Sequence, residues 1–160
     1  MADQQVRGMK HIEYAYTVGM DDEAVDERLR TAGTGVLALA DGNDAYAVPL
    51  AHYYDGNELY FRLGTTEGST KRDLLETTET ACYVLYGTDP VDGPRAFDSW
   101  SIVVTGHLTE LSGAERDRFD TAEVNDRFSP IRVFGEAIED IEVTVVKLDV
   151  EGITGRTTGN

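Results

Sequence analysis

The tripeptide Asp-Gly-Asn occurs twice, at Asp41–Asn43 and Asp55–Asn57, and each copy separates two apolar runs. An Asp-Gly turn between apolar runs is among the strongest short-range signals of a β-hairpin. We therefore predict an antiparallel meander of three strands, over Gly35–Ala40, Ala45–Tyr54 and Glu58–Leu63. Because proline has no N–H to donate to a ladder, Pro49 predicts a bulge or an unpaired edge near the centre of the middle strand.

Three further strands are predicted after the meander. The fifth strand shows the clearest alternation: its even positions from Trp100 to Leu108 are apolar or glycine, and most of its odd positions are polar. In the sixth strand the apolar phase switches near Val145 and Val146, which indicates a bulge there. The fourth, fifth and sixth strands are expected over Ala81–Gly87, Ser99–Leu111 and Ile141–Val150.

Three short helices are predicted between and before these strands. The first covers Asp21–Ala32, where acidic residues occupy the cap and first turn and Asp26 and Arg30 form an i,i+4 pair. The second follows Gly68, with Ser69 as its N-cap. The third starts at Ser112, which forms a capping box with Glu115, and runs to about residue 122. Residues 125–141 give no clear signal.

The order of these elements predicts one mainly β domain. No internal repeat or linker divides residues 1–160, so we expect a single unit with a core over about 20–156 and a disordered tail over 157–160. Strands that follow one another mostly as hairpins indicate a small antiparallel β-barrel with short helices at its ends.

The net charge of the chain indicates the environment it is suited to and the partners it does not favour. Thirty acidic residues against fourteen basic ones give a formal net charge of -16. Such charge disfavours binding to nucleic acids or to anionic membranes, and it resembles the acidic composition of halophilic proteins from a high-salt cytoplasm. The N-terminus lacks the apolar segment of a signal peptide, and no apolar run approaches the roughly 20 residues of a membrane helix. We therefore expect a cytoplasmic protein.

Several apparent motifs do not predict a site. Gly33–Ala38 matches G-x-G-x-x-A, but it follows a predicted helix and opens a strand, which is the reverse of a dinucleotide fingerprint. The three histidines, His11, His52 and His107, lack metal-ligand spacing, so no metal site is expected. The single cysteine, Cys82, lies in an apolar run and is interpreted as a buried structural thiol.

One short stretch does carry a chemical signal. Gly68-Ser69-Thr70-Lys71-Arg72 stands at the start of the second predicted helix of a strongly acidic chain. A helix N-terminus offers free N–H groups and partial positive charge, and the hydroxyls of Ser69 and Thr70 with the ammonium of Lys71 would complete a phosphate site. The alternative is that Lys71 and Arg72 only balance neighbouring carboxylates.

The ordered segments resemble those of a known family. GVLALADG, AYAVPLAHYYDGNELYFRLGTTEGSTKRDLL, ACYVLYG, SWSIVVTGHL and VVKLDVEGITGR together resemble the pyridoxamine 5'-phosphate oxidase-related, FMN-binding split-barrel family. The resemblance spans about residues 20–156 and is strongest to the branch of nitroimidazole-resistance-type flavoproteins. It implies a six-stranded antiparallel split barrel that forms a homodimer, with FMN bound at the interface between the two chains.

The resemblance also implies a set of cofactor-binding residues. The middle strand of the meander would lie along the flavin, the following strand would border it, and the Ser69 cluster would hold the phosphate. Trp100 and Ser101 would approach the flavin ring from the partner chain, and Arg156 would face the site. The expected cofactor-binding residues are Ala47, Val48, Pro49, Leu50, Ala51, Phe61, Arg62, Leu63, Ser69, Thr70, Lys71, Trp100, Ser101 and Arg156.

The function that follows from the resemblance is an FMN-dependent oxidoreductase of a small organic molecule, with NAD(P)H as a plausible electron donor and no assigned catalytic residue. The chain lacks the C-terminal Trp and Arg pair and the basic residues flanking the flavin strand that mark true pyridoxamine phosphate oxidases, so vitamin B6 oxidation is not expected. Two alternatives remain open: a deazaflavin-dependent reductase of the same fold, and a non-catalytic flavin- or haem-binding protein.

Overall fold

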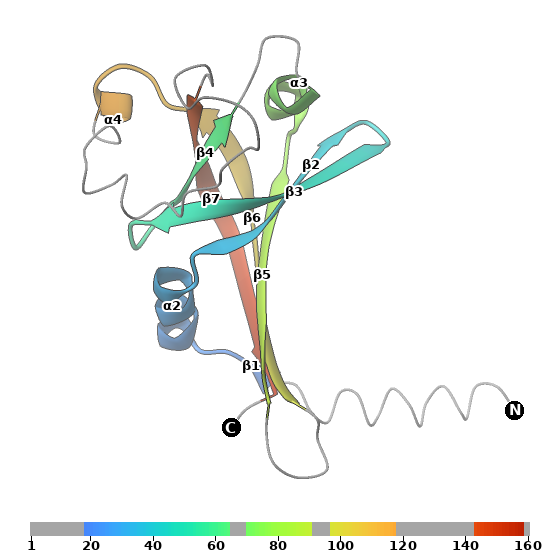
Figure 1. Cartoon of the computed structure of the whole chain (residues 1–160), viewed down its shortest axis with the longest axis vertical. Coiled ribbons are helices and arrows are strands. Elements are labelled where there is room, and N and C mark those ends of the chain that lie inside the picture. The colour runs from blue at the N-terminus through green and yellow to red at the C-terminus, as the bar shows by residue number, and fades with distance from the viewer. Residues whose placement is uncertain (1–17, 65–69, 91–96, 118–142, 159–160) are drawn as a thin grey trace, which may run out of the picture.

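The computed structural model describes residues 18–64, 70–90, 97–117 and 143–158 of the chain. Seven strands and three short helices lie within these residues, and Figure 1 shows their arrangement. In chain order they are β1 (Val18–Gly19), α2 (Asp22–Thr31), β2 (Thr34–Asp41), β3 (Asp44–Tyr54), β4 (Leu59–Gly64), α3 (Thr70–Thr77), β5 (Ala81–Pro90), β6 (Phe97–Glu110), α4 (Gly113–Asp117) and β7 (Val143–Thr157).

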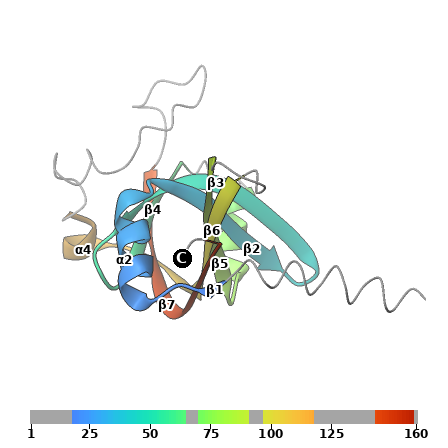
Figure 2. The same ribbon diagram turned by 90° about the horizontal axis from the view of Figure 1, so that it is seen from below.

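The strands form one antiparallel sheet that closes on itself. Their order is β1-β7-β4-β3-β2-β5-β6, and an additional pairing between β6 and β7 completes a ring of six strands. Figure 2 shows this ring end-on, with α2 along one side. The predicted six-stranded antiparallel barrel is therefore confirmed, and the two-residue β1 is an addition to it.

The meander forms as the two Asp-Gly-Asn turns predict. β2 pairs with β3 from Thr34–Ala51 to Asp41–Asp44, and β3 pairs with β4 only from His52 to Tyr54. The rest of β3, residues 44–51, therefore has no strand partner on the side away from β2 in the described chain. Pro49 lies in the middle of this unpaired edge, so the alternative of an unpaired edge is the correct one and no bulge interrupts the β2–β3 register.

Helix α2 begins and pairs its charges as the sequence predicts. Asp21 is the N-cap, and its carboxylate accepts a hydrogen bond of 2.8 Å from the N–H of Ala24. Nε of Arg30 donates to the carboxylate of Asp26 at 2.8 Å. Val25 and Leu29 are the buried residues of the helix and contribute to the barrel core.

The core fills the inside of the ring. On each strand every second residue points inward; Leu37, Phe61, Tyr83, Ile102 and Leu148 are all fully buried. On β6 the expected alternation is confirmed, since Ile102 and Val104 are buried while Thr109 and His107 are exposed.

The bulge predicted near Val145 and Val146 is wrong. The register between β4 and β7 is continuous there, from Leu59–Leu148 to Gly64–Val143. Both valines are buried because this part of β7 is covered on both faces: Val146 belongs to the barrel core, and Val145 to a smaller cluster with Ala51, Tyr60 and Leu111. The bulge lies further along, at Glu151, where the pairing partner of β7 shifts from Gly106 to Thr105.

The last strand is longer than predicted. β7 continues to Thr157, and Thr158 donates its N–H to the carbonyl of Ser99 at 2.9 Å. The expected disorder from residue 157 is therefore wrong for Thr157 and Thr158, because pairing with β6 and β1 holds them. Residues 159–160, like residues 118–142 of the third helix and the loop after it, lie outside the described residues.

Candidate functional site

The unpaired edge of β3 presents a row of backbone polar groups. The N–H of His52 donates to the carbonyl of Gly33, so the backbone groups of the even-numbered residues of β3 face β2. Those of Ala47 and Ala51, and the carbonyl of Pro49, consequently face the open edge. This edge is the feature of the described chain that most resembles a binding surface for a planar, hydrogen-bonding group.

The side chains around this edge separate into two groups. Ala47 and Pro49 are exposed and Val48 is half-buried, whereas Leu50, Phe61 and Leu63 lie in the barrel core. Phe61 packs against Tyr83 with ring centroids 4.7 Å apart. The side chains of these core residues therefore point away from a ligand at the edge, and the backbone groups of Leu50 face β2. Arg62 is half-buried on the outer face of β4, opposite Val145.

A buried polar network supports the edge from inside. The hydroxyl of Tyr83 lies 2.7 Å from Nδ1 of His52 and 3.2 Å from the carbonyl oxygen of Leu50. Nε2 of His52 lies 2.9 Å from the carbonyl oxygen of Leu29, which can only accept, so Nε2 carries the proton and Nδ1 accepts from Tyr83. Burial lowers the pKa of His52, and the hydrogen bond to Leu29 opposes that shift in part.

Gly35 makes this network possible. A Cβ at Gly35 would lie 2.6 Å from Cζ and 2.8 Å from the hydroxyl oxygen of Tyr83. The second glycine of the G-x-G-x-x-A pattern therefore leaves space for the tyrosine ring. The pattern follows helix α2 and runs into strand β2, which is the reverse of the order in a dinucleotide fingerprint. Asp55 belongs to the turn between β3 and β4, where its carboxylate accepts from the N–H groups of Asn57 and Glu58.

The predicted phosphate cluster falls partly within the described chain. Helix α3 begins at Thr70, so Thr70 and Lys71 stand in its first turn. Ser69 lies outside the described residues, and its predicted capping role stays a prediction. The start of α3 follows β4 by only the five residues 65–69, which keeps it near the end of that strand and the β3 edge.

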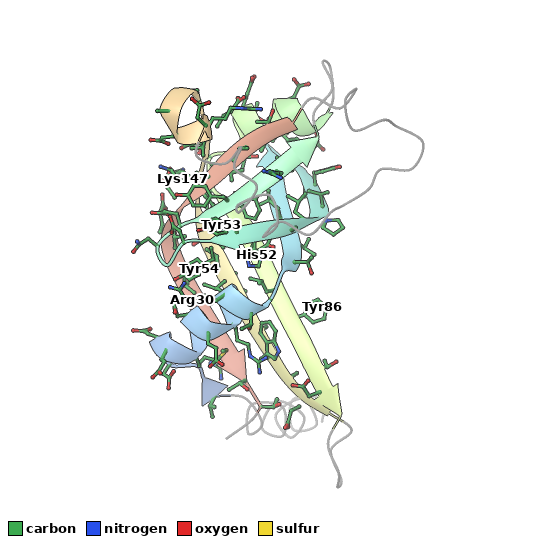
Figure 3. The ribbon with its side chains drawn as sticks, turned by 60° about the vertical axis from the view of Figure 1, so that its left-hand side comes forward. Arg30, His52, Tyr53, Tyr54, Tyr86 and Lys147 are labelled. Carbon is green, nitrogen blue, oxygen red and sulfur yellow. The ribbon has the colours of Figure 1, made fainter. Side chains whose placement is uncertain are left out.

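Trp100, Ser101 and Arg156 are brought together at the other end of the long strands. Ser101 of β6 pairs directly with Arg156 of β7, and Trp100 pairs with Thr157. They line a pocket of about 230 Å³ together with Tyr86, Gly87, Ser99 and Thr157. Tyr86 is 73% exposed, and Figure 3 shows it projecting away from the barrel. Tyr86 is not among the predicted cofactor-binding residues, since an aromatic residue in a strand run is usually part of the core.

The start of α3 and the Trp100 pocket are far apart within one chain. Trp100 pairs with Gly87, which lies six residues along β5 from Ala81, the first residue after α3 and its connection. At 3.3 Å per residue, this separation is roughly 20 Å along the strand. One chain therefore keeps the α3 end of β5 and the Trp100 pocket apart, while the β3 edge lies across β2 from β5, with Pro49, Val36 and Val84 in register.

Two other cavities are less suited to an anionic cofactor. A cavity of about 360 Å³ between α3, β6 and β7 carries the carboxylates of Glu76 and Glu110 on its wall. A larger one of about 730 Å³ lies between α2 and β7, with Asp22, Asp26 and Arg156 on its wall. Carboxylates repel a phosphate, so neither cavity competes with the start of α3 for this role.

Two of the three histidines, His52 and His107, and the single cysteine, Cys82, lie within the described residues. No group of metal-ligating side chains is found in the described part of the chain. Both ring nitrogens of His52 have partners inside the protein, and His107 contacts the Glu79 carbonyl and Glu151. Cys82 is half-buried, and burial raises the pKa of its thiol. None of the described helices is long and apolar enough to cross a membrane.

The ring of six antiparallel strands with one partly unpaired strand is the architecture of a split β-barrel. A sequence profile described as "Pyridoxamine 5'-phosphate oxidase" matches residues 21–157. The chain therefore belongs to the pyridoxamine 5'-phosphate oxidase family. A search of curated proteins found no match.

Solved structures share the fold at low sequence identity. A candidate 5-nitroimidazole antibiotic resistance protein from Bacteroides thetaiotaomicron superposes with a TM-score of 0.68 at 19% identity, over 88% of this chain and 87% of that one. A FAD-binding protein from Mesorhizobium loti gives 0.64 at 19% identity, over 88% and 97%. A FAD and heme binding protein from Mycobacterium smegmatis gives 0.66 at 18% identity, over 91% and 74%.

Proposed function

We propose that this protein binds FMN between the two chains of a homodimer and acts as an oxidoreductase on a small organic molecule. The observation that carries the proposal is the unpaired edge of β3, at residues 44–51, in a chain of the pyridoxamine 5'-phosphate oxidase family. The names of two structural neighbours, which bind FAD, support a flavin as the ligand.

The edge matches one side of an isoalloxazine ring. The pyrimidine part of this ring alternates carbonyl oxygens with ring nitrogens, one of which carries a proton. The N–H of Ala51 and the carbonyl of Pro49 offer a donor and an acceptor to this part of the ring, whereas the N–H of Ala47, roughly 13 Å from that of Ala51, lies beyond it. Pro49 cannot donate, so its position leaves an acceptor with no competing N–H between the two alanines.

The phosphate would lie at the start of α3. Thr70 and Lys71 stand in the first turn, where free backbone N–H groups concentrate and the helix dipole favours an anion. Lys71 contributes a full positive charge in a chain of net charge -16, whose own field opposes anion binding. Ser69 would complete this cluster.

A homodimer would explain the outer face of the barrel. Cross-strand neighbours on that face form rows of small and apolar side chains; one row runs from Pro49 through Val36 and Val84 to Val103, and the next from Ala47 through Ala38 to Cys82. We call these seven residues the outer patch. All seven are half-buried or exposed, although the patch is apolar. Exposed apolar patches mark interaction sites.

The dimer would also join the two separated groups of site residues. Roughly 20 Å of β5 separates the α3 end from the Trp100 pocket in one chain, and we propose that the Trp100 pocket of one protomer meets the β3 edge of the other across the outer patch. Trp100, Ser101 and Arg156 would then border the flavin from the partner chain. Tyr86 continues the outer patch toward this pocket, because it pairs with Ser101.

The protein's own residues would bind and orient rather than transfer protons. A bound flavin supplies the redox chemistry, accepting electrons from a reduced donor and passing them to a substrate. The β3 edge would fix the ring, α3 the phosphate, and Trp100 with Arg156 would shape the space above the ring. The electron donor would be NAD(P)H, bound transiently.

The alternatives are a deazaflavin in place of FMN, and a non-catalytic flavin or haem binder. Neither described histidine is free to bind haem, because both ring nitrogens of His52 are engaged and His107 contacts the Glu79 carbonyl and Glu151. The strongly acidic composition supports function in a high-salt cytoplasm, so binding should be measured in molar KCl as well as in dilute buffer.

The test is titration of the apo-protein with FMN, followed by flavin fluorescence and by the visible spectrum. We expect a bound-flavin spectrum. A hydrogen bond to a charged group contributes roughly 1.5–3 kcal/mol, so Lys71→Ala should weaken FMN binding by about 10- to 150-fold. Arg72→Ala is the matched control; it removes the same charge one position along the helix, and its effect should be smaller.

Each alternative gives a distinct result. If no flavin binds, the proposal is wrong. A deazaflavin bound in preference to FMN has its own absorption band and would replace FMN as the cofactor. Binding of FMN without oxidation of NADH or NADPH in the presence of any acceptor would indicate a non-catalytic flavoprotein. Equal FMN affinity for Lys71→Ala and the unmodified chain would move the phosphate site away from α3.

A further inference from the structure

Trp100 is held by two contacts that come from different elements. The guanidinium carbon of Arg28, on α2, lies 4.7 Å from the centroid of the Trp100 ring. This distance is well within the range of a cation–π interaction, for which tryptophan is the best aromatic partner. Arg28 is exposed and none of the sequence patterns identified it.

The second contact is with the neighbouring strand. Gly87 pairs directly with Trp100, and a Cβ at Gly87 would overlap Nε1 of the indole and lie 2.8 Å from Cε2. The indole therefore lies against the backbone of β5 at Gly87, a position that only glycine can supply. The backbone of β5 contacts the indole on one side, and the guanidinium of Arg28, on α2, lies over the ring.

The geometry points to Arg28 as a positioning residue for the site. We propose that Arg28 holds the indole of Trp100 in the orientation in which it borders the flavin of the partner chain. This inference rests on the proposed function, since it requires Trp100 to lie at the flavin. Arg28 also brings a positive charge beside the pocket lined by Trp100, Ser101 and Arg156, in a protein whose net charge repels anions.

The chain offers a direct probe of this arrangement, because Trp100 is its single tryptophan. Intrinsic fluorescence therefore reports the indole alone. In the apo-protein, Arg28→Ala should shift the Trp100 emission to the red, lower its anisotropy and increase its quenching by acrylamide. Removal of a cation–π contact should weaken FMN binding by about 2- to 5-fold. Arg28→Lys keeps the charge but loses the flat guanidinium, so its effects should fall between those of Arg28→Ala and the unmodified protein.

Arg30→Ala is the matched control. Arg30 stands on the same helix, and its guanidinium lies 5.3 Å from the centroid of another aromatic ring, that of Tyr54. Figure 3 labels both residues. The variant removes the same charge and a contact of the same kind, but away from Trp100. It should leave the Trp100 emission and the FMN affinity unchanged. Gly87→Ala, which displaces the indole, should give the spectral change of Arg28→Ala or a larger one.

The outcomes separate this proposal from the proposed function. Unchanged Trp100 emission and anisotropy in Arg28→Ala would overturn the positioning role. A mobile indole with unaltered FMN affinity would overturn its importance for the flavin. In the unmodified protein, bound FMN should quench Trp100 strongly. If FMN binds without quenching it, Trp100 does not border the flavin; the shared-site assignment then fails, and the role of Arg28 fails with it.

Discussion

His52 shows how one buried polar residue joins three parts of the barrel. It is 3% exposed, and its two ring nitrogens connect the end of α2, through the Leu29 carbonyl, with Tyr83 of β5. The Leu29 carbonyl belongs to the last turn of α2, where backbone acceptors lack intrahelical partners. The hydroxyl of Tyr83, which donates its proton to His52, also lies 3.2 Å from the Leu50 carbonyl oxygen on β3. Each of these buried polar groups therefore has a partner, as burial requires.

The burial of His52 predicts a pH dependence of stability. Because burial lowers its pKa in the folded chain, the unfolded chain binds a proton first as the pH falls. The free energy of unfolding should therefore decrease below about pH 6.5, by at most about 1.4 kcal/mol per pH unit, and this contribution should be fully present above that pH. Denaturant unfolding between pH 8 and pH 5.5 measures the slope.

His52→Gln should flatten the slope of the unfolding free energy against pH. It will also lower stability at every pH, because it disturbs the hydrogen bonds with Tyr83 and the Leu29 carbonyl. His107→Gln, at an exposed position of β6, serves as the comparison for the loss of a histidine. An identical slope for His52→Gln and the unmodified chain would show that the proton affinity of His52 does not differ between the folded and unfolded chains.

At the scale of elements, glycines decide where strands and side chains approach closely. Gly35 leaves space for Tyr83, Gly87 for Trp100, and Gly106 for the backbone of β7 at the bulge. At Gly155 a Cβ would lie 2.9 Å from a methyl of Val25, so this glycine lets α2 pack on β7. These close contacts hold the helices and the bulge in place around a core of ordinary apolar residues.

The bulge provides a prediction about Gly106. An alanine there would overlap the carbonyl oxygen of Asp149, and because this atom belongs to the backbone of β7, the strand itself would have to move. Gly106→Ala should cost about 1–3 kcal/mol of unfolding free energy, as overpacking usually does. Thermal or denaturant unfolding of the variant checks it.

Gly152→Ala is the matched variant on the other side of the same bulge. Its Cβ would lie 3.1 Å from the hydroxyl oxygen of Thr105, a side-chain atom that can rotate away. The loss of stability should therefore be smaller than for Gly106→Ala. A larger loss of stability for Gly152→Ala than for Gly106→Ala would mean that the backbone of β7 moves away from Gly106 at little cost.

At the scale of the whole molecule, the apolar outer patch is unusual for so acidic a chain. With a net charge of -16, two copies repel each other in dilute buffer, and this repulsion weakens as salt shortens the Debye length from about 10 Å at 0.1 M to about 3 Å at 1 M. A dimer held by the outer patch should thus become more stable with salt.

A single charge in the patch should separate the proposed dimer. Light scattering in molar KCl should give about twice the 17.6 kDa of one chain. Val84→Glu places a carboxylate at the centre of the patch and should yield monomers with reduced FMN affinity, because the partner's residues are lost. Ala114→Glu adds the same charge on the exposed α4 and should remain dimeric. A monomer that binds FMN as tightly as the unmodified protein would contradict the shared site.

The local pattern of the sequence already determined most of the fold. The two Asp-Gly-Asn turns set the meander, Asp21 set the start of α2, and the alternation along β6 set its inner face, since turn chemistry, capping and side-chain period act over a few residues. The ordered segments also carried the family resemblance, which the profile match confirms.

Only the tertiary structure decided the rest. The bulge at Glu151 and the double burial of Val145 and Val146 depend on which strands and clusters cover β7, and a phase switch in one strand cannot distinguish these cases. The partners of Gly35, Gly87 and His52, and the contact of Arg28 with Trp100, join residues that are 13 to 72 positions apart in the sequence. Such contacts arise from packing across the closed barrel, and a local pattern carries no record of them.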